Sequence, residues 1–506
     1  MTKTVSEINQ KIKNREAVVV TAEEMIEIVR ENGAKKASED VDVVTTGTFG
    51  AMCSSGAFLN FGHSDPPMKL EEVWLNDVHA YGGIAAVDVY IGATEKSRYD
   101  EHYGGAHVIE DLVNGKSVKL KAKAHGTDCY PKKRMDTIFR LSEINQAILL
   151  NPRNCYQNYA AATNSSKKII HTYMGTLLSN LGNVTYSTSG QLSPLLNDPY
   201  LRTIGVGTKI FIGGAQGYVI GEGTQHNTNV ARRNGIPMSP AGTLMVKGNL
   251  KEMNSKFLRA ATFHGYGHSL YVGIGIPIPV LDEEIAKATG VSNAEIFTNI
   301  YDYSLPKRSR PSIKEVSYAE LRTGAVEING KNVETSSLSS YKRAREIANE
   351  LKKWIGEGEF LLNFPLEKLP QSEFKPMQEI KKAVLVMDIM KKTSTCGVDD
   401  TIEHAAELMV INQVNHIPVV SGDTLVGIIT SWDVAKAIGT RTHKLQDIMT
   451  KEVVTVESSD PIDVAAVRMH KNKISALPVV DWMKKPMGII TSEDISKLMS
   501  IPEFKT

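Results

Sequence analysis

The sequence predicts a large mixed domain, of the α/β or α+β class, followed by a smaller module of two βαββα repeats. Three observations support this prediction. The chain has 506 residues, more than one ordinary hydrophobic core accommodates. Amphipathic helix patterns alternate with short β-branched strands over residues 1–330. The last part of the chain contains an internal repeat whose copies begin near residues 388 and 447.

Several predicted strands in the large domain end in small residues. Residues 41–50, 84–92 and 210–217 each run from apolar or β-branched residues into a stretch containing glycine. Small residues at strand ends let backbone amides approach a substrate, as they do in many α/β proteins. We therefore assign residues 1–330 to one catalytic domain, and its topology stays open.

Residues 331–380 are predicted to connect the two parts. A helix with charged faces is expected over residues 340–355, followed by Gly356-Glu357-Gly358. Pro365, Pro370 and Pro376 then interrupt the approach to the repeats. We therefore place the first repeat at residues 381–442 and the second at residues 443–506.

The two repeats match at four places in the same order. Apolar residues with the spacing of a buried helix stripe begin at Ile402 and again at Ile462. The other matches are Asp388-Ile389-Met390 with Asp447-Ile448-Met449, Ile417-Pro418-Val419-Val420 with Leu477-Pro478-Val479-Val480, and Gly427-Ile428-Ile429-Thr430-Ser431-Trp432-Asp433 with Gly488-Ile489-Ile490-Thr491-Ser492-Glu493-Asp494. Each copy predicts a strand, a helix, two strands and a second helix.

The end of each repeat has the features of a nucleoside site. Thr430 and Thr491 follow an apolar strand and open a helix, where free backbone N–H groups favour an electron-rich group. Asp433 and Asp494 are suited to accept hydrogen bonds from ribose hydroxyls. The alternative is that both carboxylates only cap their helices. The candidate ligand-binding residues also include Ile417, Pro418, Leu477 and Pro478.

The overall composition excludes several classes of protein. A formal net charge of +1 gives no global attraction to nucleic acid or to an anionic membrane. No signal-peptide core and no membrane-length apolar run is present, so a cytoplasmic location is expected. No standard phosphate-loop, dinucleotide or metalloprotease motif is complete. We expect no metal and no tightly bound cofactor.

Cys129 is the candidate catalytic cysteine. It follows His125 by four residues and precedes Lys132, Lys133 and Arg134, and nearby positive charge stabilises a thiolate. Gly126 and Pro131 predict a turn rather than a buried element, although Asp128 opposes the electrostatic effect. Cys53 lies in a second small-residue loop and is the next candidate. Cys155 and Cys396 are expected to be passive, and no disulfide is expected.

The two repeats resemble a tandem pair of CBS domains. This resemblance implies an adenosine ligand in clefts between the repeats, such as S-adenosylmethionine, methylthioadenosine, AMP or ATP. It also implies a homodimer formed through the CBS pair. A module of this kind regulates an attached domain through a coupling free energy of roughly 1–3 kcal/mol.

Two segments of the large domain, residues 45–56 and 125–131, together with the CBS pair, resemble the archaeal homocysteine-biosynthesis family of sulfurtransferases. The resemblance extends over essentially the whole chain. It implies addition of sulfide-derived sulfur to L-aspartate semialdehyde through a persulfide on Cys129. The product L-homocysteine is more reduced than the aldehyde, so the resemblance also implies electrons from a separate ferredoxin-like partner. His125, Lys132 and Arg134 are candidates to hold the substrate carboxylate.

Two other classes of function remain as alternatives. One is a non-catalytic sensor of adenosine metabolites, whose large domain binds a partner or a small ligand. The other is an enzyme like inosine-monophosphate dehydrogenase, which also combines a catalytic cysteine with CBS repeats. In that enzyme the repeats interrupt a barrel, whereas here they follow the large domain, so this alternative is the weaker one.

Overall fold

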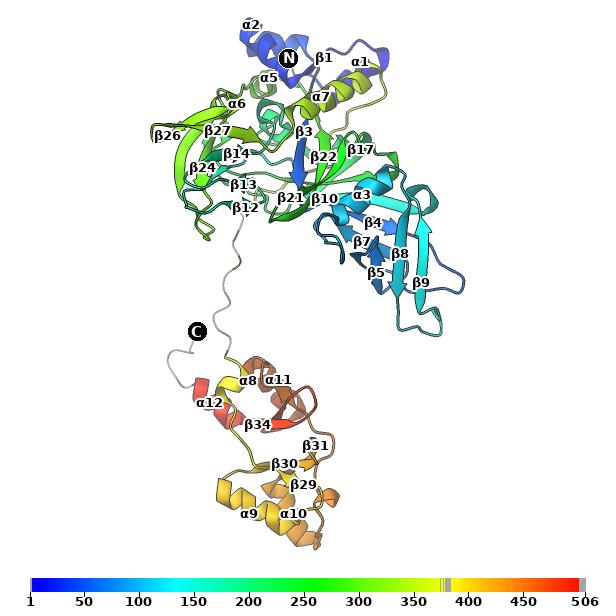
Figure 1. Ribbon diagram of the computed structural model, residues 1–506, viewed down its shortest axis with the longest axis vertical. Helices are drawn as coiled ribbons and strands as arrows, with labels where there is room; N and C mark the ends of the chain where they lie inside the picture. Colours follow the sequence, from blue (N-terminus) through cyan, green and yellow to red (C-terminus); the bar gives the residue numbers. More distant parts are fainter. Residues whose placement is uncertain (1, 374, 376, 378–383, 500–506) are drawn as a thin grey trace. The chain divides into compact units, whose positions relative to one another are not determined.

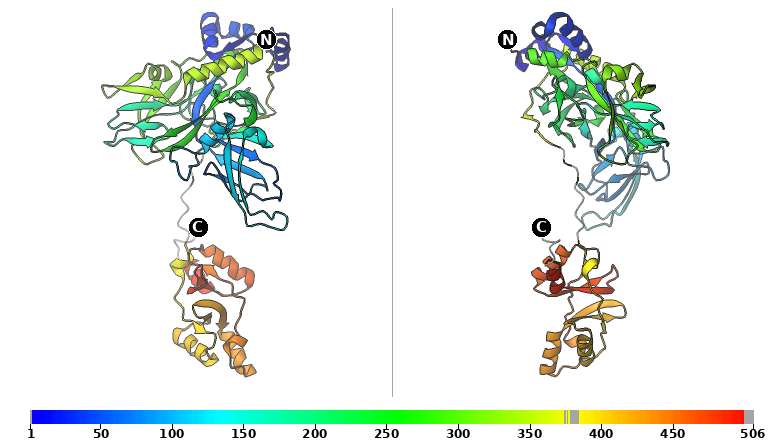
Figure 2. Two further views of the ribbon diagram at one scale, coloured as in Figure 1. Left: turned by 45° about the vertical axis from the view of Figure 1, so that its right-hand side comes forward. Right: turned by 90° about the vertical axis from the view of Figure 1, so that its left-hand side faces the viewer.

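The computed structural model describes residues 2–373, 375, 377 and 384–499, and the chain forms two compact units. The first unit spans Met1–Lys375 and the second spans Pro376–Thr506. Figures 1 and 2 show the two units in three views. Pro376, residues 378–383 and residues 500–506, which belong to the connector and repeats expected from the sequence, lie outside the described residues.

The first unit is built on a 13-stranded sheet whose strand pairs are antiparallel. Its strands, in spatial order, are β21 (Leu258–Phe263), β22 (Gly267–Gly275), β16 (Lys209–Ile212), β17 (Ala215–Glu222), β20 (Leu244–Asn249), β10 (Gln146–Asn154), β4 (Gly56–Asn60), β7 (Asp88–Gly92), β6 (Val78–Tyr81), β5 (Glu72–Leu75), β8 (Val118–Lys123) and β9 (Arg134–Phe139). β3 (Thr48–Met52) pairs with β22 off this path. The β8–β9 hairpin lies at one end of the unit (Figure 1).

A mixed six-stranded sheet packs around a second hydrophobic core. Its order is β25 (Ser312–Ser317), β24 (Phe297–Asp302), β11 (Ala161–Thr163), β14 (Asn183–Tyr186), β27 (Lys331–Ser337) and β26 (Ala325–Ile328). A three-stranded sheet joins β1 (Val19–Thr21), β2 (Val43–Thr45) and β23 (Pro277–Pro279). The small two-stranded sheets pair β12 (Ile170–Thr172) with β13 (Gly175–Leu177), β15 (Gly205–Val206) with β28 (Glu367–Lys368), and β18 (Arg232–Arg233) with β19 (Ile236–Pro237).

The helices of the first unit are fewer than its strands. They are α1 (Val5–Asn14), α2 (Ala22–Asp40), α3 (Gly105–Val113), α4 (Pro194–Asn197), α5 (Glu283–Thr289), α6 (Tyr318–Arg322) and α7 (Tyr341–Gly356), with short 3₁₀ turns at Leu141–Glu143, Gly190–Leu192 and Leu250–Glu252. The fold class expected from the sequence, a mixed domain followed by a repeat module, is confirmed.

The helix expected over residues 340–355 is α7, and it belongs to the first unit. Its apolar face is buried against β22, β3 and β1. Gly47 permits this close packing, because a Cβ there would lie 2.1 Å from the Ala344 carbonyl oxygen. β27 and α7 are thus part of the folded unit, although the sequence suggested a connector over residues 331–380.

Three of the predicted strands are shorter or divided. Residues 41–50 form β2 and the start of β3, and only Asp88–Gly92 of residues 84–92 is a strand. Residues 210–217 lie in two strands, because Gly213 and Gly214 adopt φ values of +61° and +93° and form a hairpin turn. In this antiparallel sheet, the small residues at that position serve the turn rather than a ligand site.

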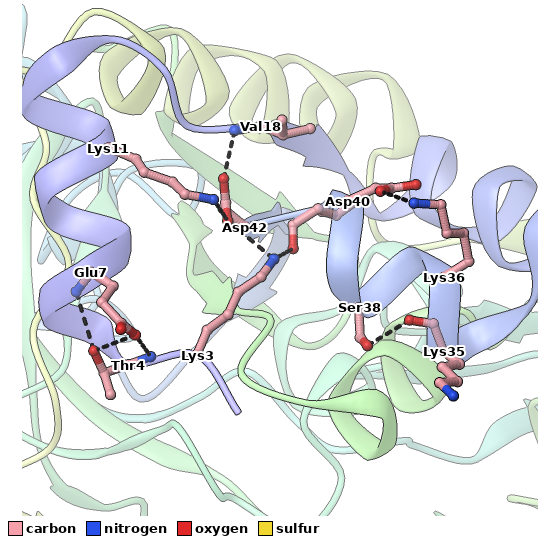
Figure 3. Close-up of polar contacts among 11 residues, drawn as sticks. Lys3, Thr4, Glu7, Lys11, Val18, Lys35, Lys36, Ser38, Asp40 and Asp42 are labelled. Atoms are coloured by element: carbon pink, nitrogen blue, oxygen red, sulfur yellow. Dashed lines mark hydrogen bonds and ion pairs between the residues drawn. The ribbon is translucent and has the colours of Figure 1, made fainter. Parts of the chain in front are cut away.

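A buried carboxylate ties the N-terminal segment to the sheet. The Asp42 side chain is 1% exposed and accepts hydrogen bonds from the Lys11 ammonium at 2.8 Å and from the Val18 N–H at 3.0 Å. The Lys3 ammonium lies 3.1 Å from the same carboxylate (Figure 3). Burial raises the pKa of Asp42, but these three donors outweigh it and leave the pKa below its ordinary value. The site therefore holds an ionised carboxylate.

The second unit consists of two repeats with matching elements. The first contains α8 (Val386–Ile389), β29 (Cys396–Gly397), α9 (Ile402–Asn412), β30 (His416–Ser421), β31 (Thr424–Thr430) and α10 (Ser431–Thr440). The second contains a 3₁₀ turn (Leu445–Asp447), β32 (Val456–Glu457), α11 (Ile462–Asn472), β33 (Ala476–Val480), β34 (Pro486–Thr491) and α12 (Ser492–Met499). Each repeat has a three-stranded sheet and a small hydrophobic core, as the repeated apolar pattern predicts. Val386 of α8 packs in the core of the second repeat, and Leu445 packs in the core of the first.

Candidate functional site

A small cavity in the first unit contains Cys53. This residue lies in the turn between β3 and β4, and its side chain is half-buried. The cavity volume is about 60 Å³, which at roughly 15 Å³ per water molecule suits a small metabolite better than a nucleotide. The lining consists of Ala51, Met52, Cys53, Ser54, Arg153, Tyr156, Tyr159, Tyr173, Met174, Ser187, Phe263, Tyr266, Ser269, Leu338 and Ser339.

Tyrosine hydroxyl groups surround the thiol of Cys53. The Tyr266 hydroxyl donates a hydrogen bond to Cys53 Sγ at 3.7 Å, and the Tyr159 and Tyr173 hydroxyls are 3.3 Å apart. Burial raises the pKa of Tyr156 to about 12 and raises the pKa of Tyr159 and Tyr266 well above 10. These phenols are therefore protonated near neutral pH and can donate hydrogen bonds to a bound molecule.

Arg153 reaches the cavity from an irregularity in β10. The pairing of β10 with β20 shifts register between Asn151 and Asn154, and such a bulge redirects the side chains within it. The Arg153 N–H donates to Asn151 Oδ1 at 3.1 Å, and the Ser54 hydroxyl donates to the Arg153 carbonyl oxygen at 3.2 Å. These bonds fix the Arg153 backbone beside the turn that carries Cys53.

Cys129 lies elsewhere, in the loop between β8 and β9. Figure 1 shows this hairpin directed away from β3. The Thr127 and Tyr130 N–H groups donate to each other's carbonyl oxygens at 3.0 and 3.1 Å, which makes a tight turn with Cys129 at its exposed tip. Gly126, at φ +81°, allows the chain to enter this turn. Cys129 is not among the residues that line the Cys53 cavity.

The basic residues predicted beside Cys129 share this hairpin. The His125 imidazole pairs with Glu71, with Nδ1 2.6 Å from Oε1. Lys132 is half-buried and donates its backbone N–H to the Pro67 carbonyl oxygen, whereas Arg134 is exposed at the start of β9. These three side chains surround the Cys129 loop and do not line the Cys53 cavity.

The other two cysteines are buried. Burial raises the pKa of Cys155, and burial together with the nearby Asp400 carboxylate raises the pKa of Cys396 to about 11. Both thiols therefore stay protonated at neutral pH and are poor nucleophiles. This agrees with the passive roles expected for them.

Two clefts of about 500 Å³ lie in the second unit, a volume typical of small-molecule sites. His416 and Ser475 line both clefts, and a 3.0 Å hydrogen bond between their side chains separates them. The first cleft is lined by His416, Ile428, Thr430, Thr450, Glu452, Val453, Val454, Lys473, Ile474, Ser475, Ala476, Pro478 and Ser492. The second is lined by Lys391, Lys392, Thr393, Ser394, Asn412, Gln413, Val414, Asn415, His416, Ser475, Ile489, Thr491, Ser492, Glu493 and Asp494.

The two candidate aspartates both cap helices, but with one oxygen each. Asp433 Oδ2 accepts from the Thr430 N–H at 2.9 Å and from its hydroxyl at 2.6 Å, and Asp494 Oδ2 makes the same pair with Thr491 at 3.0 and 2.6 Å. Asp494 Oδ1 binds the Lys391 ammonium at 2.6 Å. Among the described residues, no hydrogen bond to Asp433 Oδ1 is found, so this oxygen is available to a ligand.

The clefts contain four of the eight residues expected to bind the adenosine ligand. Thr430 and Pro478 line the first cleft, and Thr491 and Asp494 line the second. Asp433 is half-buried outside both linings, and Ile417, Pro418 and Leu477 are buried in strands β30 and β33. Sequence reasoning missed Lys391 and Thr450, although each directly follows a repeated Asp-Ile-Met triplet.

Among the described residues, no group of three or more His, Cys, Asp or Glu side chains is arranged to hold a metal ion. Within the same part of the chain, no helix has both the length and the apolar character needed to cross a membrane.

These features define the class of protein. The second unit matches the CBS domain model twice, over residues 386–440 and 445–501, so the chain carries a paired CBS module behind a larger catalytic unit. Residues 17–362 match the model described as "Homocysteine biosynthesis enzyme, sulfur-incorporation". The chain therefore belongs to this enzyme family, and the family recognised from the sequence is confirmed.

The chain is similar to relatives over its whole length. It is 54% identical to the L-aspartate semialdehyde sulfurtransferase of Methanosarcina acetivorans, over 98% of this chain and 99% of the relative. It is 53% identical to the enzyme of the same name from Methanocaldococcus jannaschii, over 98% of each chain. A solved CBS domain pair in complex with 5′-methylthioadenosine and S-adenosyl-L-methionine is 41% identical, covers 23% of this chain and 96% of that one, and has a TM-score of 0.23.

Proposed function

We propose that this chain is an L-aspartate semialdehyde sulfurtransferase, which forms L-homocysteine through a cysteine persulfide. The observation that supports this best is the pair of thiols in the first unit, because they meet two different needs. Cys129 is exposed at a loop tip, where a sulfur donor can reach it, and Cys53 faces a cavity of the size of a small metabolite. The relatives named as this enzyme are similar over essentially the whole chain.

In this proposal, Cys129 is the cysteine on which the persulfide forms. The basic residues His125, Lys132 and Arg134 flank it in the sequence. Cys53 assists by receiving the outer sulfur. Its thiolate attacks that sulfur, the S–S bond at Cys129 breaks, a new S–S bond forms at Cys53, and Cys129 leaves as a thiolate. This exchange consumes no electrons.

The outer sulfur of the Cys53 persulfide then bonds to the aldehyde carbon. Four electrons and four protons cleave the remaining S–S bond, remove the carbonyl oxygen as water and produce the CH₂–SH group. Forming the Cys129 persulfide from the thiol and sulfide releases two electrons, which the oxidised form of the ferredoxin-like partner accepts, so the net demand counted from sulfide is two. We propose that a separate ferredoxin-like reductase partner supplies these electrons.

The proposal is tested by reconstitution with the full-length chain, sulfide, L-aspartate semialdehyde and a low-potential reductant. We expect homocysteine to form. We also expect the peptide that contains Cys129 to gain about 32 Da, one sulfur atom, when the aldehyde and the reductant are omitted and a two-electron oxidant accompanies the sulfide. Peptides that contain Cys155 and Cys396 provide internal controls, because their thiols are buried. An unmodified Cys129 peptide in a preparation that forms homocysteine would contradict the role of this residue.

The CBS pair is proposed to bind an adenosine ligand such as S-adenosylmethionine, methylthioadenosine, AMP or ATP. The clefts are large enough for a nucleoside, and Asp433 Oδ1 is available to accept hydrogen bonds from ribose hydroxyls. The pair is also proposed to form the homodimer. The CBS helices leave large apolar side chains exposed, namely Val410, Ile411, Trp432, Ile438 and Val467, and a second CBS pair would cover them.

Replacing Asp433 by Asn tests the adenosine site. The amide keeps an oxygen for the Thr430 cap but presents N–H donors to the ribose, so we expect about tenfold weaker binding of the preferred ligand. Calorimetric titration of the full chain with S-adenosylmethionine, and separately with AMP, measures this change. The control is Asp463→Asn, because Asp463 is an exposed first-turn acid of α11, whereas Asp433 is bonded to Thr430, which lines the first cleft. Equal affinity in wild type and Asp433→Asn would remove Asp433 from the site.

A further inference from the structure

The Cys53 cavity contains one permanently charged side chain among its described lining residues, and that is the guanidinium of Arg153. Arg153 is half-buried, and within the described part of the chain it has no acidic partner. Its neighbours are phenols: Arg153 lowers the pKa of both Tyr156 and Tyr266, although burial keeps each pKa raised overall. A cation without a counter-charge, facing a cavity, is a site for an anionic ligand.

We propose that Arg153 binds the carboxylate of the small amino-acid aldehyde in the Cys53 cavity and thereby directs its carbonyl carbon toward Cys53. The inference rests on the proposed function and adds to it the residue that selects the substrate. Tyr266 is near both groups, because its hydroxyl donates a hydrogen bond to Cys53 Sγ and the Arg153 charge lowers the pKa of its phenol. In this proposal, the carboxylate and the aldehyde of a four-carbon substrate meet a cation and a thiol that line the same cavity.

Two serine hydroxyl groups support a polar ligand at this position. Ser269 and Ser339 line the cavity and are 2% and 4% exposed, yet within the described residues neither side-chain hydroxyl has a hydrogen-bond partner. Each hydroxyl can donate one hydrogen bond and accept others, so a polar molecule in the cavity could bind to them. They are suited to the substrate's ammonium group and to its carboxylate oxygens.

The local backbone is shaped to present Arg153. The register shift in β10 redirects the residues between Asn151 and Asn154, and Cys155, two positions after Arg153, adopts the left-handed φ of +52°. Non-glycine residues rarely adopt this conformation, and strained backbone gathers at functional sites.

The basic residues of the β8–β9 hairpin are poorer candidates for this task. The His125 imidazole already faces the Glu71 carboxylate, and Arg134 is exposed to solvent. None of the basic residues that flank Cys129 lines the cavity. We therefore assign the substrate carboxylate to Arg153 rather than to His125, Lys132 or Arg134, which the sequence alone suggested.

The test compares two alkylating reagents of similar size on the full-length chain. Iodoacetate carries a carboxylate and iodoacetamide does not, so the ratio of their rates at Cys53 reports a nearby cation independently of thiolate content. Replacing Arg153 by Met should lower this ratio at Cys53 about tenfold, as measured by mass spectrometry of the Cys53 peptide. Arg153→Lys, which keeps the charge, should restore most of the ratio.

Two controls accompany this experiment. Cys129 in the same sample should keep its ratio, because it lies outside the cavity. Arg30→Met removes an exposed cation on α2 and should change neither cysteine. In the sulfur-transfer assay, Arg153→Met should raise KM for L-aspartate semialdehyde at least about tenfold while sulfur loading of Cys129 is unchanged.

The results separate this inference from the proposed function. If the chain transfers no sulfur to the aldehyde but the alkylation ratio still depends on Arg153, the anion site stands and the proposed reaction fails. If the chain is active but Arg153→Met leaves both the ratio and KM unchanged, the carboxylate site is overturned. Restoration of the ratio by Arg153→Lys also shows that loss in the Met variant does not come from misfolding.

Discussion

Replacing Cys129 by Ser is expected to lower homocysteine formation from sulfide and L-aspartate semialdehyde by at least about 1,000-fold, because a serine hydroxyl cannot hold a transferable sulfur. Replacing Cys53 by Ser should cause a loss of similar size at a later step. The two variants differ in the species that accumulates. Cys53→Ser should retain sulfur on the Cys129 peptide, whereas Cys129→Ser should leave the Cys53 peptide unmodified when the donor is too large for the cavity.

A small sulfur donor should distinguish the role of Cys129 from that of Cys53. Hydrogen disulfide is small enough to enter a cavity of about 60 Å³, so it should load Cys53 directly in Cys129→Ser and restore part of the activity. Cys396→Ala serves as the control, since this thiol is buried in the CBS unit and its raised pKa keeps it unreactive. Full activity of Cys129→Ser with a bulky persulfide donor would contradict the transfer of sulfur from Cys129 to Cys53.

The proposed transfer of sulfur from Cys129 to Cys53 requires the two thiols to come together. Cys129 does not line the Cys53 cavity, and its hairpin is directed away from β3 (Figure 1). The proposed transfer therefore needs either movement of the hairpin or the hairpin of a second copy of the chain. Mixing Cys53→Ser with Cys129→Ser distinguishes these routes, because only transfer between copies restores activity in the mixture. A dimer formed through the CBS pairs would bring the two copies together.

The CBS unit could be predicted closely because its information is local and occurs twice. The spacing of Ile402, Ala405 and Met409 predicts one face of α9, and the same spacing from Ile462 predicts α11. Thr430 and Asp433 form the expected cap of α10 through bonds three residues apart. Contacts of this kind join residues that are close in sequence, so sequence patterns predict them.

The Cys53 cavity could not be predicted, because its walls come from distant parts of the chain. Cys53, Arg153, Tyr266 and Ser339 lie on separate elements, and only the folding of the sheets brings them together. Nothing near Arg153 in sequence marks it as a ligand for an anion. Cys129 was the more visible candidate, since its basic neighbours are adjacent in sequence.

Alternation of strands and helices likewise indicated a mixed domain without indicating how the strands pair. The small side chains within residues 210–217 suggested a ligand site, but Gly213 and Gly214 make the turn between β16 and β17. The apolar stripe of α7 suggested a helix, but not that it packs on β22 and β3. Pairing and packing depend on contacts that no local pattern specifies.

Replacing Asp42 by Ala is expected to lower the free energy of unfolding of the first unit by about 3 kcal/mol, because it leaves two ammonium groups beside a buried site without their carboxylate. The Lys3 and Lys11 side chains are 18% and 45% exposed, so water partly solvates both ammonium groups. This hydration limits the loss in unfolding free energy. Urea unfolding followed by tryptophan fluorescence measures this change. Trp74 is 6% exposed and reports the first unit, whereas Trp432 and Trp482 are already exposed in the second.

Asp40 provides the matched control. It pairs with Lys36 at 2.6 Å on the surface of α2, where both side chains are about half exposed (Figure 3). A surface pair of this kind contributes less than about 1 kcal/mol, so Asp40→Ala should unfold almost as the wild type does. If Asp42→Ala and Asp40→Ala lowered the free energy of unfolding equally, the contacts of Asp42 would not stabilise the packing of α1 against β2.

The stabilisation of the folded state by Asp42 should decrease as the pH falls. Its folded-state pKa lies below the ordinary value of 3.8, so ionised Asp42 stabilises the folded state fully above that value. The stabilisation is lost as the pH falls through the lower, folded-state pKa, because the protonated acid no longer pairs with Lys11 and Lys3. The difference in unfolding free energy between wild type and Asp42→Asn should thus be constant from pH 7 to about pH 5 and shrink below about pH 4. A difference that grows on acidification would require a folded-state pKa above the ordinary one, which three donors around a single carboxylate do not allow.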